Sequence, residues 1–459
     1  MRKITSVICL FCVLLISGCN TVIFDSSLNE ETQSEEYDLK FDEKEVDASY
    51  DPNKSTYIEL GDEDITITKH GTYILEGTLN NASVIVDVEK TEDVQLVFNN
   101  VTINSNDFAG VYIVEGDEIT ITLPEGTVNT ICDSSSYKTI DLNNVDALIF
   151  SKADLIINGK GTLNLKSEFN HGIVSKDDLI ICGGNYNIET AGSGLSGKDR
   201  LKISDGTFRI NTDKDAIKSD NHEEKYRGYV YIRGGTFDIA SYGDAIYGYS
   251  LVYIDGGNYN IKTINKTNDS NKAVKSVKQI VVSNGDFEIE SNDDGLHCDE
   301  NIIINGGSFN IVSKDDGIHS DYKAEINDGN ISIKAREGIE ATYVQINGGT
   351  INISATDDGI NAGKKTTEYD PTFEMNDGSL TIVVGEGDTD GIDSNGYIIV
   401  NGGKIDITCE SAFDYDKGSE FNGGTIIVNG EEINEITNQF NGFGDKKPGS
   451  DNPDQGNDE

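Results

Sequence analysis

The sequence repeats one acidic phrase at a fixed interval, and this period constrains the fold more than any other feature. SNDDGLHCDE at 291–300 returns 22 residues later as SKDDGIHSDY at 313–322. Steps of 21 or 22 residues, with longer steps where loops are inserted, join the small residue of each repeat: Gly172, Gly194, Ala216, Ala245, Ala273, Gly295, Gly317, Gly338, Gly359, Gly391 and Ala412. Such a short period predicts stacked repeats that each form one supersecondary unit.

Each repeat has the residue pattern of short β-strands. Apolar and polar residues alternate, and the 3.6-residue period of a helix is absent from the sequence. The repeat at 295–313 contains GLHC, NIIINGG and SFNIVS, which leaves room for three strands and three turns. Its Asn305-Gly306-Gly307 turn can supply the positive φ of a tight corner. We therefore predict an all-β fold, a right-handed parallel β-helix with three short strands in each repeat.

Two sets of residues are predicted to fill the interior, because strand side chains alternate between the two faces. The residue after each small residue is apolar, as in Ile318 and Ile339. The third strand of successive repeats contributes an aromatic residue at one position: Tyr186, Phe208, Phe237, Tyr259, Phe287 and Phe309.

The N-terminus has the pattern of a lipoprotein signal peptide. Arg2 and Lys3 precede a short apolar run that ends in Ile16-Ser17-Gly18-Cys19. Such a run with small residues before a cysteine indicates cleavage and lipidation rather than a permanent membrane span. We expect residues 1–18 to be removed and Cys19 to anchor the protein outside the cytoplasmic membrane.

The rest of the chain divides by composition. Residues 19–55 are acidic and aperiodic and are predicted to be a disordered tether, residues 56–436 hold the repeats, and residues 437–459 form a disordered polar tail. The chain has 81 acidic residues against 36 basic residues, a net charge of -45. This charge disfavours nucleic acid and anionic membrane surfaces as partners and favours cations such as calcium. We expect a monomer that touches the membrane only through its lipid.

The motifs DAIKSD, DGLHCD, DGIHSD, EGIEA and DDGINA, with their INGG turns, resemble those of clostridial carbohydrate-binding β-helix proteins related to the β-helix pectate lyases. The resemblance extends from about residue 55 to residue 435. It implies calcium binding, secretion or surface attachment, and association with acidic pectic sugars and cellulose. Polygalacturonate is therefore the expected partner, with cellulose as a second candidate.

The repeated Asp-Asp-Gly phrases suggest a stack of carboxylates. Adjacent strands lie about 4.8 Å apart, so Asp294 should lie over Asp316. Two carboxylates at ~5 Å repel by roughly 3 kcal/mol at an effective dielectric of ~20, and a divalent cation with oxygen ligands would neutralise them. The predicted calcium ligands are Asp293, Asp294, Asp315, Asp316, Asp357, Asp358, Asp390, Asp393 and Asp414. In the alternative interpretation, each aspartate is only a turn residue.

One polar position lies between the two inward positions of the first strand, and we expect it to face outward. In successive repeats it holds the predicted polysaccharide-binding residues Lys218, Tyr247, Lys275, His297, His319 and Glu340. Further aromatic candidates are Tyr226, Tyr229, Tyr231, Tyr242 and Tyr249. The chain has no tryptophan, which excludes a flat tryptophan platform for crystalline cellulose. A solvated face without a binding role is the alternative.

Three other functions stay open. A calcium-dependent pectate lyase would use Lys218 or Lys275 as the base next to the metal. A galacturonan hydrolase would use paired aspartates. A structural surface protein or adhesin would need no catalytic residues. A zinc site at His297 and His319 is not expected, because the neighbouring Cys298 should point inward. We favour a non-catalytic binding protein, with no catalytic residue.

Overall fold

The computed structural model describes residues 36–134, 136–264, 271–385 and 389–438. The predicted signal peptide, Cys19 and almost all of the predicted tail lie outside these ranges. The chain divides into Met1–Glu36 and Tyr37–Glu459, and all the features below belong to the second unit. Within the described ranges, no helix is long and apolar enough to span a membrane.

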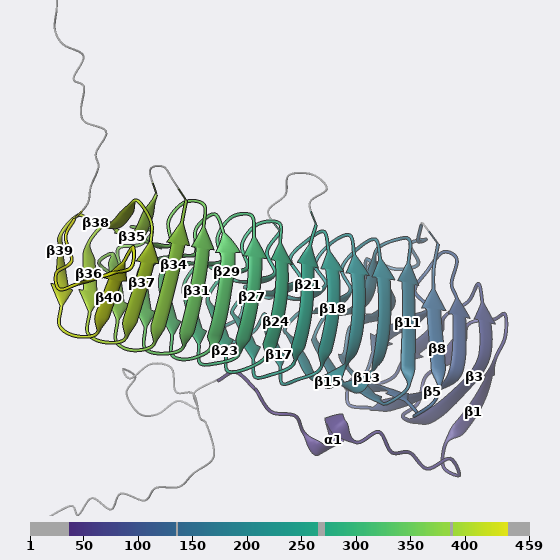
Figure 1. The fold of residues 1–459 in the computed structure, drawn as a ribbon. Coiled ribbons are helices and arrows are strands. Elements are labelled where there is room, and N and C mark those ends of the chain that lie inside the picture. Colours follow the sequence, from purple (N-terminus) through teal and green to yellow (C-terminus); the bar gives the residue numbers. More distant parts are fainter. Residues whose placement is uncertain (1–35, 135, 265–270, 386–388, 439–459) are drawn as a thin grey trace, which may run out of the picture. The chain divides into compact units, whose positions relative to one another are not determined.

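The predicted all-β class is confirmed. The described residues form 41 strands and one short helix, α1 (Glu43–Val46). Strands one repeat apart pair in parallel and in register, as β24 (Asp286–Ser291) does with β27 (Ser308–Ser313). The final pair is the exception, because β40 (Thr425–Val428) and β41 (Glu431–Ile433) are antiparallel. Figure 1 shows the stacked repeats that result.

The strands form three columns, and each repeat contributes to all three. The first column contains β2 (Ile65–Ile67), β4 (Val84–Asp87), β6 (Val111–Glu115), β9 (Ala147–Ser151), β12 (His171–Ser175), β14 (Leu195–Gly197), β16 (Ile217–Ser219), β19 (Ile246–Gly248), β22 (Val274–Ser276), β25 (Leu296–Cys298), β32 (Ile360–Ala362), β35 (Asp390–Ser394) and β38 (Ser411–Tyr415). The second contains β1 (Thr56–Leu60), β7 (Glu118–Leu123), β10 (Asp154–Gly159), β17 (Tyr229–Ile232), β20 (Leu251–Ile254), β23 (Gln279–Val282), β26 (Asn301–Ile304), β33 (Thr372–Met375), β36 (Tyr397–Val400) and β39 (Gly418–Phe421). The third contains β8 (Val128–Cys132), β11 (Thr162–Ser167), β18 (Thr236–Ser241), β21 (Asn258–Thr263), β24, β27, β29 (Asn330–Ala335), β31 (Thr350–Ala355), β34 (Ser379–Val384), β37 (Lys404–Thr408) and β40.

Six longer strands turn from one column into the next. Strands β3 (Gly71–Asn80), β5 (Val94–Asn104), β13 (Asp178–Thr190) and β15 (Arg200–Thr212) run through the second and third columns. Strands β28 (Ile318–Ile326) and β30 (Ile339–Ile346) run through the first and second. The parallel register places residues one repeat apart directly above each other, which decides how the candidate site is built.

The predicted interior is confirmed by an aromatic stack. The rings of Tyr186, Phe208, Phe237, Tyr259, Phe287 and Phe309 lie face to face in succession. Their centroids are 4.5 to 4.8 Å apart, which is close to the spacing of adjacent strands. All six rings are buried, so each also contributes a large apolar area to the core.

Amide side chains form a second continuous stack at the turns after the second column. Each asparagine donates from Nδ2 to Oδ1 of the asparagine one repeat earlier, at 2.8 or 2.9 Å. The members of this asparagine row are Asn305, Asn327, Asn347, Asn376, Asn401 and Asn422. The row fixes the turns of six repeats relative to each other.

Replacing Asn376 with alanine should lower the free energy of unfolding by about 1–2 kcal/mol, because it removes the hydrogen bonds that Asn376 makes with both of its neighbours in the row. Asn376 donates to Asn347 and accepts from Asn401, both at 2.8 Å. Urea denaturation measures the change. Asn352→Ala is the matched control, since Asn352 is exposed on β31 and should change stability by less than about 0.5 kcal/mol. Equal effects of the two variants would show that the row contributes nothing specific.

Part of the predicted disordered tether is ordered. Residues 37–49, which we call the N-terminal strap, lie along the repeats, and Figure 1 shows this segment with α1. Phe41 stacks on Tyr231 with ring centroids 5.6 Å apart, and Tyr37 meets Tyr229 edge to face at 5.3 Å. The prediction of disorder failed here because the acidic composition conceals the apolar residues of the strap, which alternate at positions 37, 39 and 41.

A buried lysine holds the strap in place. The side chain of Lys202 is only 1% exposed, and its Nζ lies 3.1 Å from Glu45 Oε1 and 3.2 Å from Asp38 Oδ2. The same Nζ donates to the carbonyl oxygen of Lys40 at 2.6 Å. Because the strap covers them, Tyr229 and Tyr231 are buried and cannot offer the sugar-stacking surface that we predicted.

Candidate functional site

The predicted polysaccharide-binding residues form one continuous row of strand neighbours in the first column. Register pairs join Lys218, Tyr247, Lys275, His297, His319, Glu340, Asn361, Asp393 and Asp414 in that order. We call this row the ladder. Its side chains are less accessible than we expected, and exposure falls from 32% at Lys275 to 18% at His297 and 8% at Glu340. Lys275 is therefore more accessible to a ligand than the middle of the ladder.

A row of acidic side chains runs beside the ladder and joins the repeats to each other. Asp294 Oδ1 accepts the backbone N–H of Asp316 at 3.0 Å, and Asp358 Oδ1 accepts that of Asp390 at 2.8 Å. Asp215 receives the N–H of Asp244 in the same way. The predicted stacking of Asp294 and Asp316 is confirmed, and one oxygen of Asp294, of Asp358 and of Asp215 has a structural role that the sequence did not predict.

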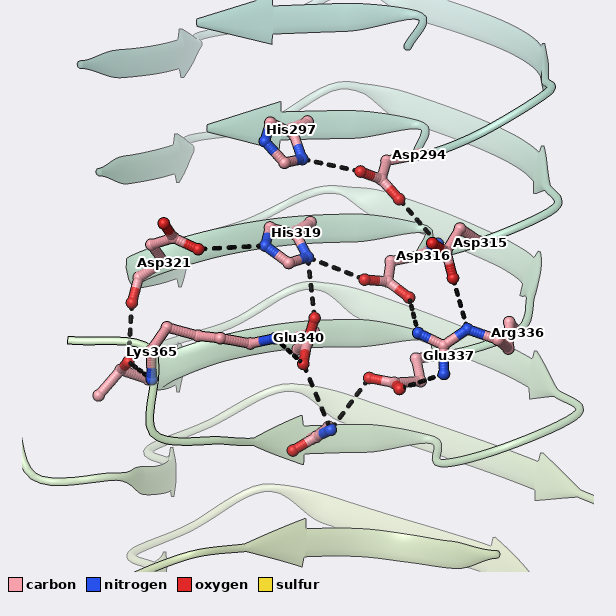
Figure 2. A network of polar contacts seen from close by, with 12 residues as sticks. Asp294, His297, Asp315, Asp316, His319, Asp321, Arg336, Glu337, Glu340 and Lys365 are labelled. Atoms are coloured by element: carbon pink, nitrogen blue, oxygen red, sulfur yellow. Dashed lines mark hydrogen bonds and ion pairs between the residues drawn. The ribbon is translucent and has the colours of Figure 1, made fainter. Parts of the chain in front are cut away.

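The second oxygen of Asp294 meets a histidine of the ladder, and so does one oxygen of Asp316. Asp294 Oδ2 lies 2.7 Å from His297 Nδ1, and Asp316 Oδ2 lies 2.8 Å from His319 Nδ1. Figure 2 shows the two pairs in adjacent repeats. The imidazole rings stack with centroids 4.7 Å apart. The spacing of Asp and His by three residues therefore encodes an ion pair that repeats from one strand to the next.

Neighbouring carboxylates favour the charged form of both ladder histidines. Burial opposes ionisation of His319, but hydrogen bonds to Asp316 and Glu340 raise its pKa to about 10. Its Nε2 faces Asp321 at 3.3 Å, so carboxylates surround both ring nitrogens. Against burial, hydrogen bonds from His319 and Lys365 lower the pKa of Glu340 to about 2. A doubly protonated ring can donate a hydrogen bond from each nitrogen to these carboxylates.

Protein cations neutralise much of the predicted calcium site in the middle of the ladder. Lys272 Nζ contacts Asp293 and lies 3.5 Å from Asp294 Oδ2. Arg336 contacts Asp315, with NH2 3.2 Å from Asp316 Oδ1 and NH1 2.9 Å from Asp357 Oδ2. Figure 2 shows Arg336 among the carboxylates.

Sequence analysis missed these two cations, although the repeats contain the signal. In the alignment, Lys272 occupies the position of Asp294, and Arg336 occupies the position of Asp315. A cation in a column of acids indicates that the column is partly neutralised by the chain itself.

The C-terminal end of the ladder differs, because its carboxylates lack such cations. Among the described residues, Asp358, Asp393 and Asp414 take part in no ion pair. Burial and then neighbouring carboxylates raise the pKa of Asp358 and of Asp393 to about 7. Asp390 accepts a hydrogen bond from the Ser411 hydroxyl. The possible metal ligands at this end are all carboxylate oxygens, which calcium prefers. The carboxylates at this end are therefore less neutralised by the chain than those in the middle, while the three that converge within 4.8 Å are Asp293, Asp294 and Asp315 of the middle.

The two lysines of the ladder lie next to aspartates. Lys218 Nζ is 3.0 Å from Asp220 Oδ2 and 3.7 Å from Asp215 Oδ2. Burial opposes its charge, but the two carboxylates raise the pKa of Lys218 above its usual value. Lys275 Nζ is 3.6 Å from Asp244 Oδ2 and 5.6 Å from the ring centroid of Tyr247. This end of the ladder presents ammonium groups beside an aromatic ring.

Comparison with known proteins agrees with a role in carbohydrate binding. A family model described as carbohydrate-binding domain-containing protein matches residues 61–317 and 309–432. The chain belongs to this family. A carbohydrate-binding domain-containing protein of Acetivibrio thermocellus is 30% identical over 191 residues, which are 41% of this chain and 67% of that protein. A solved structure described as the polysaccharide lyase-like protein from C. thermocellum, a gadolinium derivative, is 28% identical, with a TM-score of 0.43 over 56% of this chain and 96% of that one.

Proposed function

We propose that this chain is a surface-anchored, calcium-binding protein that captures acidic, pectic plant polysaccharide without cleaving it. The observation that carries the proposal is the ladder, which begins with accessible ammonium groups and an aromatic ring and ends with carboxylates that lack protein cations. Membership of the carbohydrate-binding family supports the ligand class. The parallel, in-register strand pairing supports a right-handed parallel β-helix as its scaffold.

The lysine end would bind the polymer directly. The ammonium groups of Lys218 and Lys275 can donate charge-assisted hydrogen bonds to uronate carboxylates. Tyr247 lies between these lysines in the ladder, and its half-buried ring can pack on a sugar face. Cellulose lacks carboxylates, so it would depend on the ring alone and should bind more weakly.

The carboxylate end would draw calcium to Asp358, Asp390, Asp393 and Asp414, which lie in three successive repeats. Calcium supplies a positive charge that these residues and a uronate can share, which matters because a chain of net charge -45 repels a polyanion. These four aspartates would supply carboxylate oxygens as calcium ligands, and their partial burial would exclude part of the solvent from the ion. The lipid anchor at Cys19 lies outside the described residues and stays a prediction.

The pectate lyase alternative requires a lysine that is neutral at the working pH. The carboxylates of Asp215 and Asp220 act in the opposite direction on Lys218, since they raise its pKa. An ammonium group can bind a uronate but cannot remove a proton from it. We therefore place binding before elimination.

The double variant Lys218→Ala, Lys275→Ala should bind polygalacturonate at least about tenfold more weakly in the presence of calcium, because two charge-assisted hydrogen bonds are lost. Affinity gel electrophoresis or calorimetry measures the change. The matched control is Lys166→Ala, Lys334→Ala, which removes two exposed lysines from the third column and should bind as the parent does. Equal losses in both variants would mean that net charge alone governs binding.

Calcium dependence is tested with Asp358→Asn, Asp393→Asn in the same assay. These residues are preferred to Asp294 and Asp316, whose replacement would also disturb the histidine pairs. The variant and the chelated parent should both lose most of the binding. Full binding under chelation would contradict the calcium role, and growth of ultraviolet absorbance from an unsaturated product would replace the binding proposal with the lyase.

A further inference from the structure

A second group of carboxylates lies away from the ladder, at the start of the second-column strands. Asp154 begins β10 and Asp178 begins β13, with Asp177 directly before it. The register places Glu118 of β7 on one side of Asp154 and Arg200 of β15 on the far side of Asp178. We call Asp154, Asp177 and Asp178 the N-terminal acidic cluster.

The three side chains converge. One carboxylate oxygen from each of them lies within 4.8 Å of the others. Calcium binds oxygen at about 2.3–2.6 Å, so two ligands of one ion can be up to about 5 Å apart. A single calcium ion can therefore reach all three residues. The exposed Asp177 leaves one side of the cluster open for water ligands.

One oxygen of the cluster is buried without a partner. Asp178 is 3% exposed, and its Oδ1 accepts no hydrogen bond. Its Oδ2 lies 2.6 Å from Arg200 Nε. A buried carboxylate oxygen without a donor is costly, and native proteins normally supply a hydrogen bond or an ion at such a place.

Protein cations lie at both ends of the row formed by Glu118, Asp154, Asp178 and Arg200, but not in its middle. Lys44 Nζ lies 2.9 Å from Glu118 Oε1. Arg200 divides its charge between Asp178 and Asp38 of the strap, with NH1 2.8 Å from Asp38 Oδ2. In the described part of the chain, Asp154 and Asp177 form no ion pair. Burial, followed by the charge of Asp177, raises the pKa of Asp154 to about 6, and burial raises the pKa of Asp178 to about 7 against the opposing effect of Arg200.

We propose that Asp154, Asp177 and Asp178 bind one calcium ion that stabilises the repeats beneath the strap. The donor set consists of carboxylate oxygens, without histidine or cysteine, which selects a hard cation. The site lies on a different column from the ladder and does not rest on polysaccharide binding.

The test uses calcium alone as the probe, with chelator-stripped full-length protein and isothermal titration calorimetry. Asp154→Asn, Asp177→Asn should bind one calcium ion fewer than the parent. Its matched control, Asp255→Asn, Asp286→Asn, removes two exposed carboxylates elsewhere and should keep the full stoichiometry. Asp358→Asn, Asp393→Asn removes the proposed ladder ion and should leave this one in place, which separates the two sites.

A parent and a cluster variant with equal stoichiometry would overturn the proposal and show that protons or Arg200 alone neutralise the cluster. If the double variant does not fold, Asp177→Asn suffices, because this side chain is exposed and its change removes one ligand only. It should weaken the corresponding calcium affinity at least about tenfold and reduce the calcium-induced rise in melting temperature. An unchanged affinity in this variant would likewise contradict the site.

Discussion

Replacing Lys202 with methionine is expected to lower the free energy of unfolding by about 3–5 kcal/mol, because it leaves a buried carboxylate without its cation. Glu45 is buried beside Lys202, and the two charged atoms lie 3.1 Å apart. Asp38 loses one of its two cations in the same variant. Chemical denaturation followed by circular dichroism measures the change.

The double variant Lys202→Met, Glu45→Gln separates the charge from the packing. Because it removes both ions of the pair, it should recover much of the lost stability. Arg209→Met is the control, since Arg209 belongs to the same strand but its side chain is 79% exposed. A double variant as unstable as Lys202→Met would show that the strap depends on the shape of the lysine and not on its charge.

Raising the pH from 7 to 11 should remove about 2–4 kcal/mol of stability through His319. A histidine in the unfolded chain titrates near pH 6.5. Because the folded-state pKa of His319 is raised to about 10, its ion pairs stabilise the fold fully below pH 6.5 and are lost as the pH rises through 10. Burial raises the pKa of Asp316 to about 7 against its hydrogen bond with His319, so Asp316 titrates at the lower end of this range and His319 at the upper end.

Thermal unfolding at a series of pH values, without calcium, tests this expectation. His319→Gln should be less stable at pH 7 and should lose the alkaline decline that belongs to His319. His70→Gln is the control, because the side chain of His70 is 74% exposed and pairs with Glu92 at the surface. An alkaline decline of the same size in His319→Gln would assign it to the lysines instead.

The sequence predicts well whatever the repeat determines. The period places His297 between Lys275 and His319 in the stack, and the strand register confirms this order. The inward aromatic positions follow from alternation within one strand, which is equally local. The all-β class, the interior and the order of the ladder could therefore be derived without coordinates.

The missing parts depend on contacts that the period does not encode. The strap contacts Lys202 across a long stretch of sequence, since Glu45 and Lys202 are 157 residues apart. The orientation of Asp294, with one oxygen on a backbone N–H and one on His297, depends on atomic geometry. The same holds for the burial of Glu340, which we expected to face the ligand and which instead lies between His319 and Lys365. A pattern of residue types cannot distinguish a polar side chain that faces a ligand from one that is held by contacts inside the protein.

The strap changes how the stack can come apart. In a repeat protein each unit usually contacts only its neighbours, so opening can begin at any unit and spread. Here the strap contacts two distant units: Lys44 pairs with Asp93, and the Tyr37 hydroxyl donates a hydrogen bond to the carbonyl oxygen of Ser250. The units between these points must therefore open together, as one cooperative block. The units that carry Asp393 and Asp414 are joined to the stack through their neighbours, so fluctuations should concentrate at the end where we place the calcium ion of the ladder.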